Sequence, residues 1–431
     1  MTSAPALSES SFALSIVLIA LVPFAALGLA LINTGLGRSR SAAHTMLTSL
    51  CVLAVAAITY LVFGFASQGT AGGPAHSLVI RGTAWNWIAA QPLFFRGLTY
   101  SDSTSLIACL QMLSVGLAAI IPLGSGSDRW RLGAICASSA LFAGITYPVF
   151  AHWVWGGGWL SQIAHLGIGQ GFLDCAGSGT VQVTGGLTAL SIAWIIGPRR
   201  GKFSHDGMPT AIPGHNSVLV LVGCLIALVG WLALNSAGSL LFAGASSGRL
   251  GLVVINTLLA AFSGLLAALI TTRIRFGKPD TSLSANGWVA GLVAISASCA
   301  FVVPATAIVI GAIAGILIPF AIDTFEFRLA IDDPGGSIAV HAVGGLWGLI
   351  AAGLFARVLG SQSGQMLAQV IGIATLLGFV FPLTYGLNWA LDRIYPQRVA
   401  VEGERQGMDL HELGADAYPE FAIHTDEFIP R

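Results

Sequence analysis

Two stretches of the chain, residues 174–187 and 333–346, share one pattern of polar and small residues. Each has an aspartate, then a glutamine or histidine eight residues later, then Gly-Gly-Leu, and the two copies are 159 residues apart. The polar positions are Gln182 and His341, and both lie inside apolar runs. Ionisable side chains in such runs are costly and usually mark the path of a solute or proton. We therefore predict that Gln182 and His341 meet at the interface of two repeats; the alternative is a structural hydrogen bond between helices.

The residues that precede the first of these runs could attract a cation. Asp174 stands where the run begins, so its carboxylate could favour an arriving cation or could simply cap a helix. Trp155 is followed by three glycines, which indicates a tight turn that presents its ring. The faces of tryptophan rings attract cations, but tryptophan is also enriched at membrane interfaces for other reasons.

The composition requires that most of the surface faces lipid. Of 431 residues, 55% are hydrophobic and only 9% are charged, against about 25% charged in a soluble domain. The chain has no basic patch, so nucleic acid is not expected as a partner. Its six cysteines are scattered without a Cys-x-x-Cys pair, and we predict neither a metal site nor a cofactor.

A membrane-spanning helix needs about 20 mostly apolar residues. The first apolar run, residues 12–33, is longer than the apolar core of a signal peptide and lacks the basic segment that precedes such a core. We therefore expect this run to be retained as a spanning helix. We predict an all-α polytopic membrane protein with eleven transmembrane helices. The break between the eighth and ninth spans depends on Pro304, and without this break there would be ten spans. The eleven predicted spans are 12–33, 45–66, 104–124, 132–154, 179–196, 217–234, 251–271, 283–303, 305–322, 338–357 and 366–391.

Lysine and arginine set the expected orientation, because they are retained on the cytoplasmic side. With the N-terminus outside and the C-terminus inside, 15 of the 19 basic residues fall in the cytoplasm. The two copies of the motif then have opposite topology, which is typical of inverted-repeat transport proteins. We predict five plus five inverted helices with an extra C-terminal helix in residues 1–400, followed by a cytoplasmic tail in residues 401–431.

Further motifs occur in the same order as in one known family. Asp174-x-Ala-Gly, Gly197-Pro198-Arg199, Asn286-Gly287 and Val340-His341, with the tail motif Gly407-Met408-Asp409, resemble the ammonium transporter (Amt/Mep/Rh) family over roughly residues 10 to 420. The resemblance implies a homotrimer in the cell inner membrane with one pore per subunit. It also implies an outer site that recruits ammonium, passage of ammonia between two histidines, and a possible PII-type regulatory protein at the cytoplasmic face.

Residue by residue, the resemblance assigns substrate recruitment to Trp155, Ser239 and Asp174, and the second pore histidine to His341. The chain departs from the family at the remaining pore positions, which makes it a divergent member with an altered pore. Those positions are Gln182 for the first histidine and Ser114 and Leu234 for the two gate phenylalanines.

These departures leave several functions open. A glutamine cannot gain and lose a proton near neutral pH as histidine does, so a proton relay is interrupted at Gln182. The main expectation is a channel or transporter for ammonium, ammonia or a closely related small amine. A bulkier or methylated amine is one alternative, and an ammonium sensor with little flux is another. No nucleophile–base set or phosphate loop suggests an enzyme.

Overall fold

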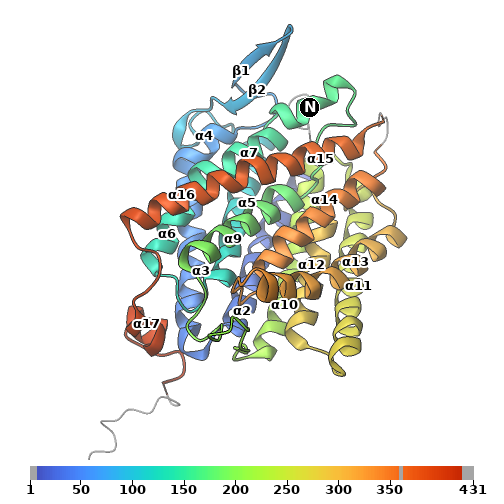
Figure 1. Ribbon diagram of the computed structural model, residues 1–431. Coiled ribbons are helices and arrows are strands. Elements are labelled where there is room, and N and C mark those ends of the chain that lie inside the picture. The colour runs from blue at the N-terminus through green and yellow to red at the C-terminus, as the bar shows by residue number, and fades with distance from the viewer. Residues whose placement is uncertain (1–6, 359–362, 420–431) are drawn as a thin grey trace, which may run out of the picture.

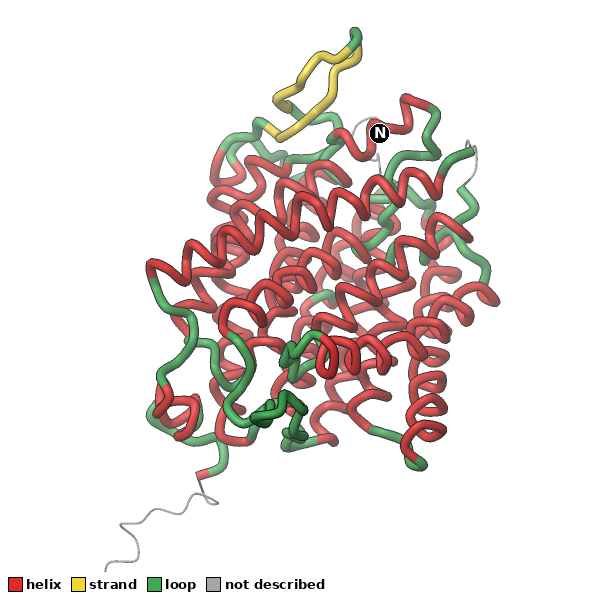
Figure 2. The backbone as a smooth tube through the Cα atoms, in the orientation of Figure 1, coloured by secondary structure: helices red, strands yellow, loops and turns green. Residues whose placement is uncertain are grey.

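The computed structural model describes residues 7–358 and 363–419. It is mostly helical, and Figures 1 and 2 show long helices running side by side, with one two-stranded hairpin at one end. We call this end, marked by strands β1 and β2, the hairpin end. The opposite end carries α17 and is called the tail end.

The helices α1–α8 precede the first copy of the repeated motif. They are α1 Glu9–Leu21, α2 Pro23–Leu36, α3 Ala42–Thr59, α4 Phe65–Gln68, α5 Ser103–Gly126, α6 Leu132–Leu141, α7 Tyr147–Val154 and α8 Trp159–Gln162. The later helices are α9 Thr184–Ile196, α10 Ser217–Leu241, α11 Leu250–Phe276, α12 Thr281–Ile295, α13 Pro304–Asp323, α14 Gly344–Phe355, α15 Gln365–Thr375, α16 Phe381–Ile394 and α17 Val401–Gln406.

Several α-helices continue into a wider π-helical turn. The π segments are η2 Tyr60–Gly64, η4 Phe142–Thr146, η6 Ser178–Val183, η8 Thr324–Arg328, η9 Ile338–Val343, η10 Leu376–Val380 and η11 Asp409–Leu413. Short 3₁₀ turns are η1 Ser39–Ser41, η3 Leu93–Phe95, η5 Ile163–Leu166 and η7 Ser247–Arg249. Single π turns are rare and occur frequently at functional sites. Segments η6 and η9 contain the two polar positions of the repeat.

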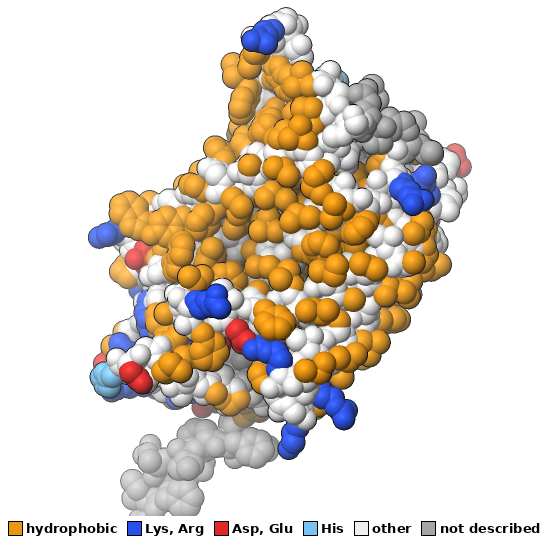
Figure 3. All heavy atoms as spheres, turned by 45° about the vertical axis from the view of Figure 1, so that its right-hand side comes forward, with side chains coloured by type: hydrophobic (Ala, Val, Ile, Leu, Met, Phe, Trp, Pro, Cys, Tyr) orange, Lys and Arg blue, Asp and Glu red, His pale blue; other side chains and the backbone are white. Residues whose placement is uncertain are grey.

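Ten helices in the described residues are long and apolar enough to cross a membrane. The prediction of a helical, multi-pass membrane protein is therefore confirmed. The predicted break before Pro304 is also confirmed, because α13 begins at this residue. The eighth predicted span is the shorter apolar helix α12, of 15 residues, so the number eleven depends on counting it. Figure 3 shows apolar side chains over most of one face, with Lys and Arg gathered mainly towards the tail end.

The hairpin is formed by β1 (Ala75–Ile80) and β2 (Thr83–Ala89), which pair antiparallel. Arg81 and Gly82 connect them, and both have positive φ, which suits a tight two-residue turn. Asn86 attaches the hairpin to the helical body, since its backbone N–H donates to Gln162 and its side chain to the carbonyl of Gly157.

The start of the predicted tail lies against the membrane-embedded body. The carboxylate of Asp409 accepts hydrogen bonds from the backbone N–H groups of Ala43 and His44, at the first turn of α3. The side chain of the N-cap residue Ser41 makes no capping hydrogen bond. The free N–H groups at the start of α3 are therefore bonded by a residue far away in sequence. Residues 420–431 of the predicted tail lie outside the described residues.

Candidate functional site

Gln182 and His341 touch each other near the middle of the molecule. His341 Nδ1 lies 2.7 Å from Gln182 Oε1, and both side chains are buried. A carboxamide oxygen only accepts hydrogen bonds, so Nδ1 of His341 carries the hydrogen and donates it. In the neutral imidazole this leaves Nε2 as an acceptor. The predicted meeting of the two repeat positions is therefore present in the structure.

The glycines of the repeated motif explain how the two segments approach so closely. A Cβ atom on Gly186 would lie 2.4 Å from the backbone nitrogen of Ala342, next to His341. A Cβ atom on Gly345 would lie 2.6 Å from the carbonyl oxygen of Ser178. Either distance is well inside van der Waals contact, so only glycine permits this crossing. Each copy of Gly-Gly-Leu thus lets its helix pack against the π segment of the other copy.

The two aspartates of the motif both cap π segments. The carboxylate of Asp174 accepts from the N–H groups of Gly177, Gly179 and Thr180 and from the Thr180 hydroxyl, at 2.7–3.0 Å. Asp333 accepts in the same way from two N–H groups at the start of the second segment, at 2.8 and 3.1 Å. The capping role of Asp174 is therefore observed, and it is compatible with a further effect on cations.

Several buried polar atoms have no hydrogen-bond partner among the described residues. They include Gln182 Nε2, His152 Nε2 and Asn235 Oδ1. A buried polar atom normally has a partner, in the protein or as water, so these atoms suggest a hydrated or solute-bearing path. Of these three residues, only Gln182 was predicted from the sequence to lie at the site. The predicted gate position Ser114 is buried and lies beside Tyr147. His152 could have been found from its position within an apolar run. The predicted gate position Leu234 is buried beside Asn235.

The ring of Trp155 is covered by another aromatic ring, which was not predicted from the sequence. Trp155 Nε1 donates to the backbone oxygen of Asp174 at 2.8 Å, which fixes the indole. Phe242 stacks on it with ring centroids 4.1 Å apart and an interplanar angle of 14°. The predicted recruitment tryptophan therefore has one face in direct contact with a phenylalanine.

The hydroxyl of Ser239 lies among protein groups. It donates to the backbone oxygen of Asn235 at 2.6 Å and lies 3.1 Å from the Cys175 sulfur and 3.5 Å from the Cys299 sulfur. The assignment of Ser239 to substrate recruitment stays a prediction. Because the hydroxyl hydrogen is already donated to Asn235, the Ser239 oxygen could only accept a hydrogen bond from a solute in this conformation.

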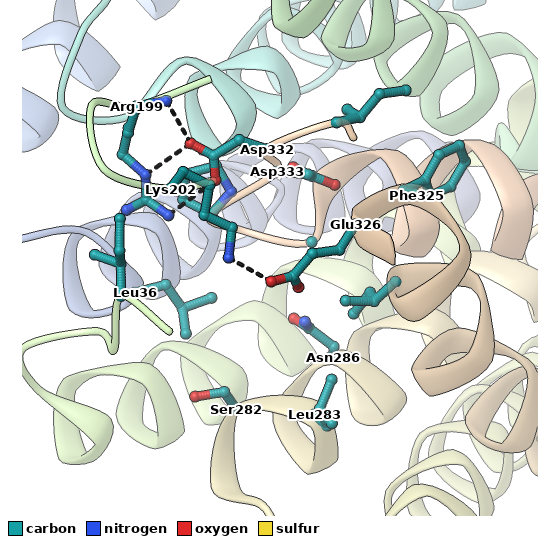
Figure 4. A pocket seen from close by; sticks show the side chains of 15 residues that line it. Leu36, Arg199, Lys202, Ser282, Leu283, Asn286, Phe325, Glu326, Asp332 and Asp333 are labelled. Atoms are coloured by element: carbon teal, nitrogen blue, oxygen red, sulfur yellow. Dashed lines mark hydrogen bonds and ion pairs between the residues drawn. The ribbon is translucent and has the colours of Figure 1, made fainter. Parts of the chain in front are cut away.

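The tail end has a cavity of about 140 Å³ lined by charged and polar side chains. In Figure 4, Lys202 and Glu326 point towards each other across it and form an ion pair, while Arg199 pairs with Asp332 at 2.9 Å. Burial alone would raise the pKa of Asp332, but the guanidinium groups of Arg129 and Arg199 hold that pKa below its ordinary value. This network ties the loops of the tail end into one charged layer.

Comparison with known proteins agrees with this architecture. The sequence profile of the Ammonium Transporter Family matches residues 13–418. The chain belongs to the ammonium transporter family. It is 36% identical over 429 residues to the ammonium transporter Amt2 of Archaeoglobus fulgidus, covering 95% of this chain and 88% of that one. It is 30% identical to an ammonium transporter of Bacillus subtilis, covering 91% of this chain and 94% of the relative.

Solved structures show the same fold. A sensor Amt protein superimposes with a TM-score of 0.84 at 29% identity, covering 93% of this chain and 97% of that one. Mep2 of Saccharomyces cerevisiae gives a TM-score of 0.77 at 25% identity, covering 91% of this chain and 90% of that one. The resemblance described from the sequence motifs is thus confirmed, and this ammonium transporter family member has a glutamine opposite its central histidine.

Proposed function

We propose that this protein conducts ammonia or ammonium, or a closely related small amine, through a pore in each subunit. The observation that carries the proposal is the buried contact between Gln182 and His341, because it places hydrogen-bonding groups at the centre of an apolar body. Membership in the ammonium transporter family supports the same solute class.

The central pair fits a small neutral amine. His341 Nε2 can accept an N–H hydrogen, and Gln182 Nε2, which has no partner among the described residues, can donate to the nitrogen lone pair. Neither side chain is an anion that would hold a cation. Gln182 does not titrate, so no proton passes along the pair. The proposed path therefore carries the solute in neutral form past this point.

Uptake of radiolabelled methylammonium into proteoliposomes tests the proposal. Vesicles with the protein should accumulate label above empty vesicles. The Gln182→Leu variant removes both the acceptor for His341 and the free donor, and we expect it to lose most of this uptake. Uptake by the wild-type protein that does not exceed that of empty vesicles would contradict the proposal.

We further propose the finer topology expected from the sequence. It comprises eleven spans in an inverted repeat of five plus five with an extra helix, the N-terminus outside and the tail inside. The hairpin end then faces outwards and carries substrate recruitment at Trp155, Ser239 and Asp174. The proposed location is the cell inner membrane. Labelling of single introduced cysteines from either side of sealed vesicles tests the orientation.

A homotrimer and a PII-type partner at the tail end remain proposals drawn from the resemblance. Native mass spectrometry of the detergent-purified protein tests the first. Co-purification with a PII-type protein tests the second, and loss of binding on removal of residues 401–431 would place the contact at the tail.

A sensor with little flux is a second candidate, and the similarity to a sensor Amt protein favours it. The interrupted relay at Gln182 and the docked tail are compatible with such a role. A bulkier or methylated amine is the other alternative solute. Thermal-shift measurements with ammonium and methylated amines, combined with uptake rates, separate the transporter, the sensor and the transporter of another amine. A sensor would be stabilised by ammonium without taking it up. A transporter of another amine would be stabilised by that amine and not by ammonium.

A further inference from the structure

Phe242 covers one face of the Trp155 indole, which belongs to the proposed recruitment site. Its ring and the Trp155 indole are nearly parallel, with centroids 4.1 Å apart. Carbon atoms in contact lie about 3.5–4.0 Å apart, so no cation fits between the two rings. Trp155 is only 5% exposed and Phe242 only 7%, so the indole offers almost no free surface while Phe242 is in place.

The two rings are held very differently. Trp155 has its Nε1 bonded to the Asp174 oxygen at 2.8 Å and its own N–H bonded to the Ala151 oxygen at 2.7 Å. Phe242 follows the last residue of α10, where its N–H is bonded to Gly238, and Gly244 with φ of 61° turns the chain shortly afterwards. The side chain of Phe242 has no polar anchor. Phe242 is therefore the partner that can move at the lower cost.

The chain lacks aromatic side chains at the two expected gate positions. Ser114 and Leu234 occupy these positions, and both are buried. An aromatic cover is nevertheless present on Trp155, contributed by Phe242, three positions after Ser239.

We propose that Phe242 is the gate of the hairpin-end mouth and a determinant of its selectivity. Its ring must leave Trp155 before a cation can bind that indole face, and the space it vacates limits the size of the cation that enters. This inference rests on the proposed function, because it assumes that an ammonium-like cation is recruited at Trp155.

The stacking supplies the expected size of the effect. Opening the gate gives up the stacking contact, so the apparent affinity of the wild-type protein includes this loss. A variant without the Phe242 ring does not give up this stacking contact when the cation binds. Its half-saturation concentration for methylammonium should therefore be about two- to tenfold lower than that of the wild-type protein. The ratio of methylammonium to ammonium transport should rise as well, because the larger cation no longer has to displace a ring.

The test compares Phe242→Leu, which retains an apolar side chain without a ring, with Phe242→Tyr, which retains the ring. The matched control is Phe379→Leu, because Phe379 contacts Trp153 with centroids 4.9 Å apart, away from Trp155. Uptake is measured over a concentration series, and methylammonium binding to each purified, monodisperse protein is measured by isothermal titration calorimetry.

A lower half-saturation concentration and tighter binding in Phe242→Leu alone would support the gate. Unchanged or weaker binding in Phe242→Leu, with normal uptake by the wild-type protein, would overturn the gate and leave the proposed function standing. Absence of both uptake and binding in the wild-type protein would overturn the proposed function together with the gate. A variant that merely disturbs folding would lower the maximal rate and the unfolding temperature without tightening binding.

Discussion

Replacing Gly186 by alanine tests whether close helix crossing creates the central site. The added Cβ would lie 2.4 Å from the backbone nitrogen of Ala342 and 2.9 Å from its Cα and Cβ. Restoring ordinary contact at about 3.4 Å requires the two segments to separate by about 1 Å. The same separation would stretch the 2.7 Å contact of Gln182 and His341 to about 3.7 Å, which is beyond hydrogen-bond distance. Overpacking of this kind costs about 1–3 kcal/mol.

The matched control is Gly386→Ala in α16. A Cβ at Gly386 meets no heavy atom within 4 Å, so alanine should be tolerated there and should slightly favour the helix. We expect Gly186→Ala to unfold at lower temperature in detergent and to lose most of its methylammonium uptake, and Gly386→Ala to match the wild-type protein. Wild-type stability and uptake in Gly186→Ala would refute the link between the Gly-Gly-Leu motif and the central pair.

Three further outcomes follow from the structure. Asp174→Asn and Asp333→Asn should each reduce the free energy of unfolding by about 1.5–3 kcal/mol, because a charged cap is weakened, and both should lower the unfolding temperature. A loss of methylammonium affinity in Asp174→Asn alone would indicate that this carboxylate also attracts the cation. Burial raises the pKa of Glu412, but its hydrogen bonds to His44 and to a backbone N–H lower it further, below 4.5. Its stabilising contribution is therefore present above this pH and is lost as the pH falls through the lower folded-state pKa. The stability deficit of Glu412→Gln at pH 7 should then shrink towards zero as the pH is lowered below 4.5, and a deficit independent of pH would contradict this. Tetramethylammonium should compete with methylammonium for binding yet not accumulate in vesicles, because it has no proton to release; measured accumulation would show that cations pass the centre intact.

The repeated motif allowed the central contact to be predicted because spacing and symmetry carried the information. Gln182 and His341 occupy corresponding positions, and helices related by a repeat bring corresponding positions together. The break before Pro304 was predictable for a local reason, since proline lacks the N–H that a helix interior requires.

Other parts of the site depend on contacts that no local pattern encodes. Phe242 follows Trp155 by 87 residues, and nothing in its neighbourhood distinguishes it from an ordinary apolar residue at a helix end. The capping of α3 by Asp409 is similar, because it joins residues 365 or more positions apart. Such contacts follow from how the helices pack, and they appear only when the whole fold is known.

The distribution of charge along the proposed path argues that the solute crosses its centre without a net charge. The Asp174 carboxylate is turned towards four hydrogen-bond donors of its own segment, so little of its charge is free to neutralise a cation further in. The central pair contributes no anion, and an unpaired cation buried in apolar surroundings is strongly disfavoured. A neutral amine pays no such penalty and finds both a donor and an acceptor there. Because Gln182 does not titrate, it carries no proton at the centre, yet it retains the hydrogen bonds that a neutral amine needs.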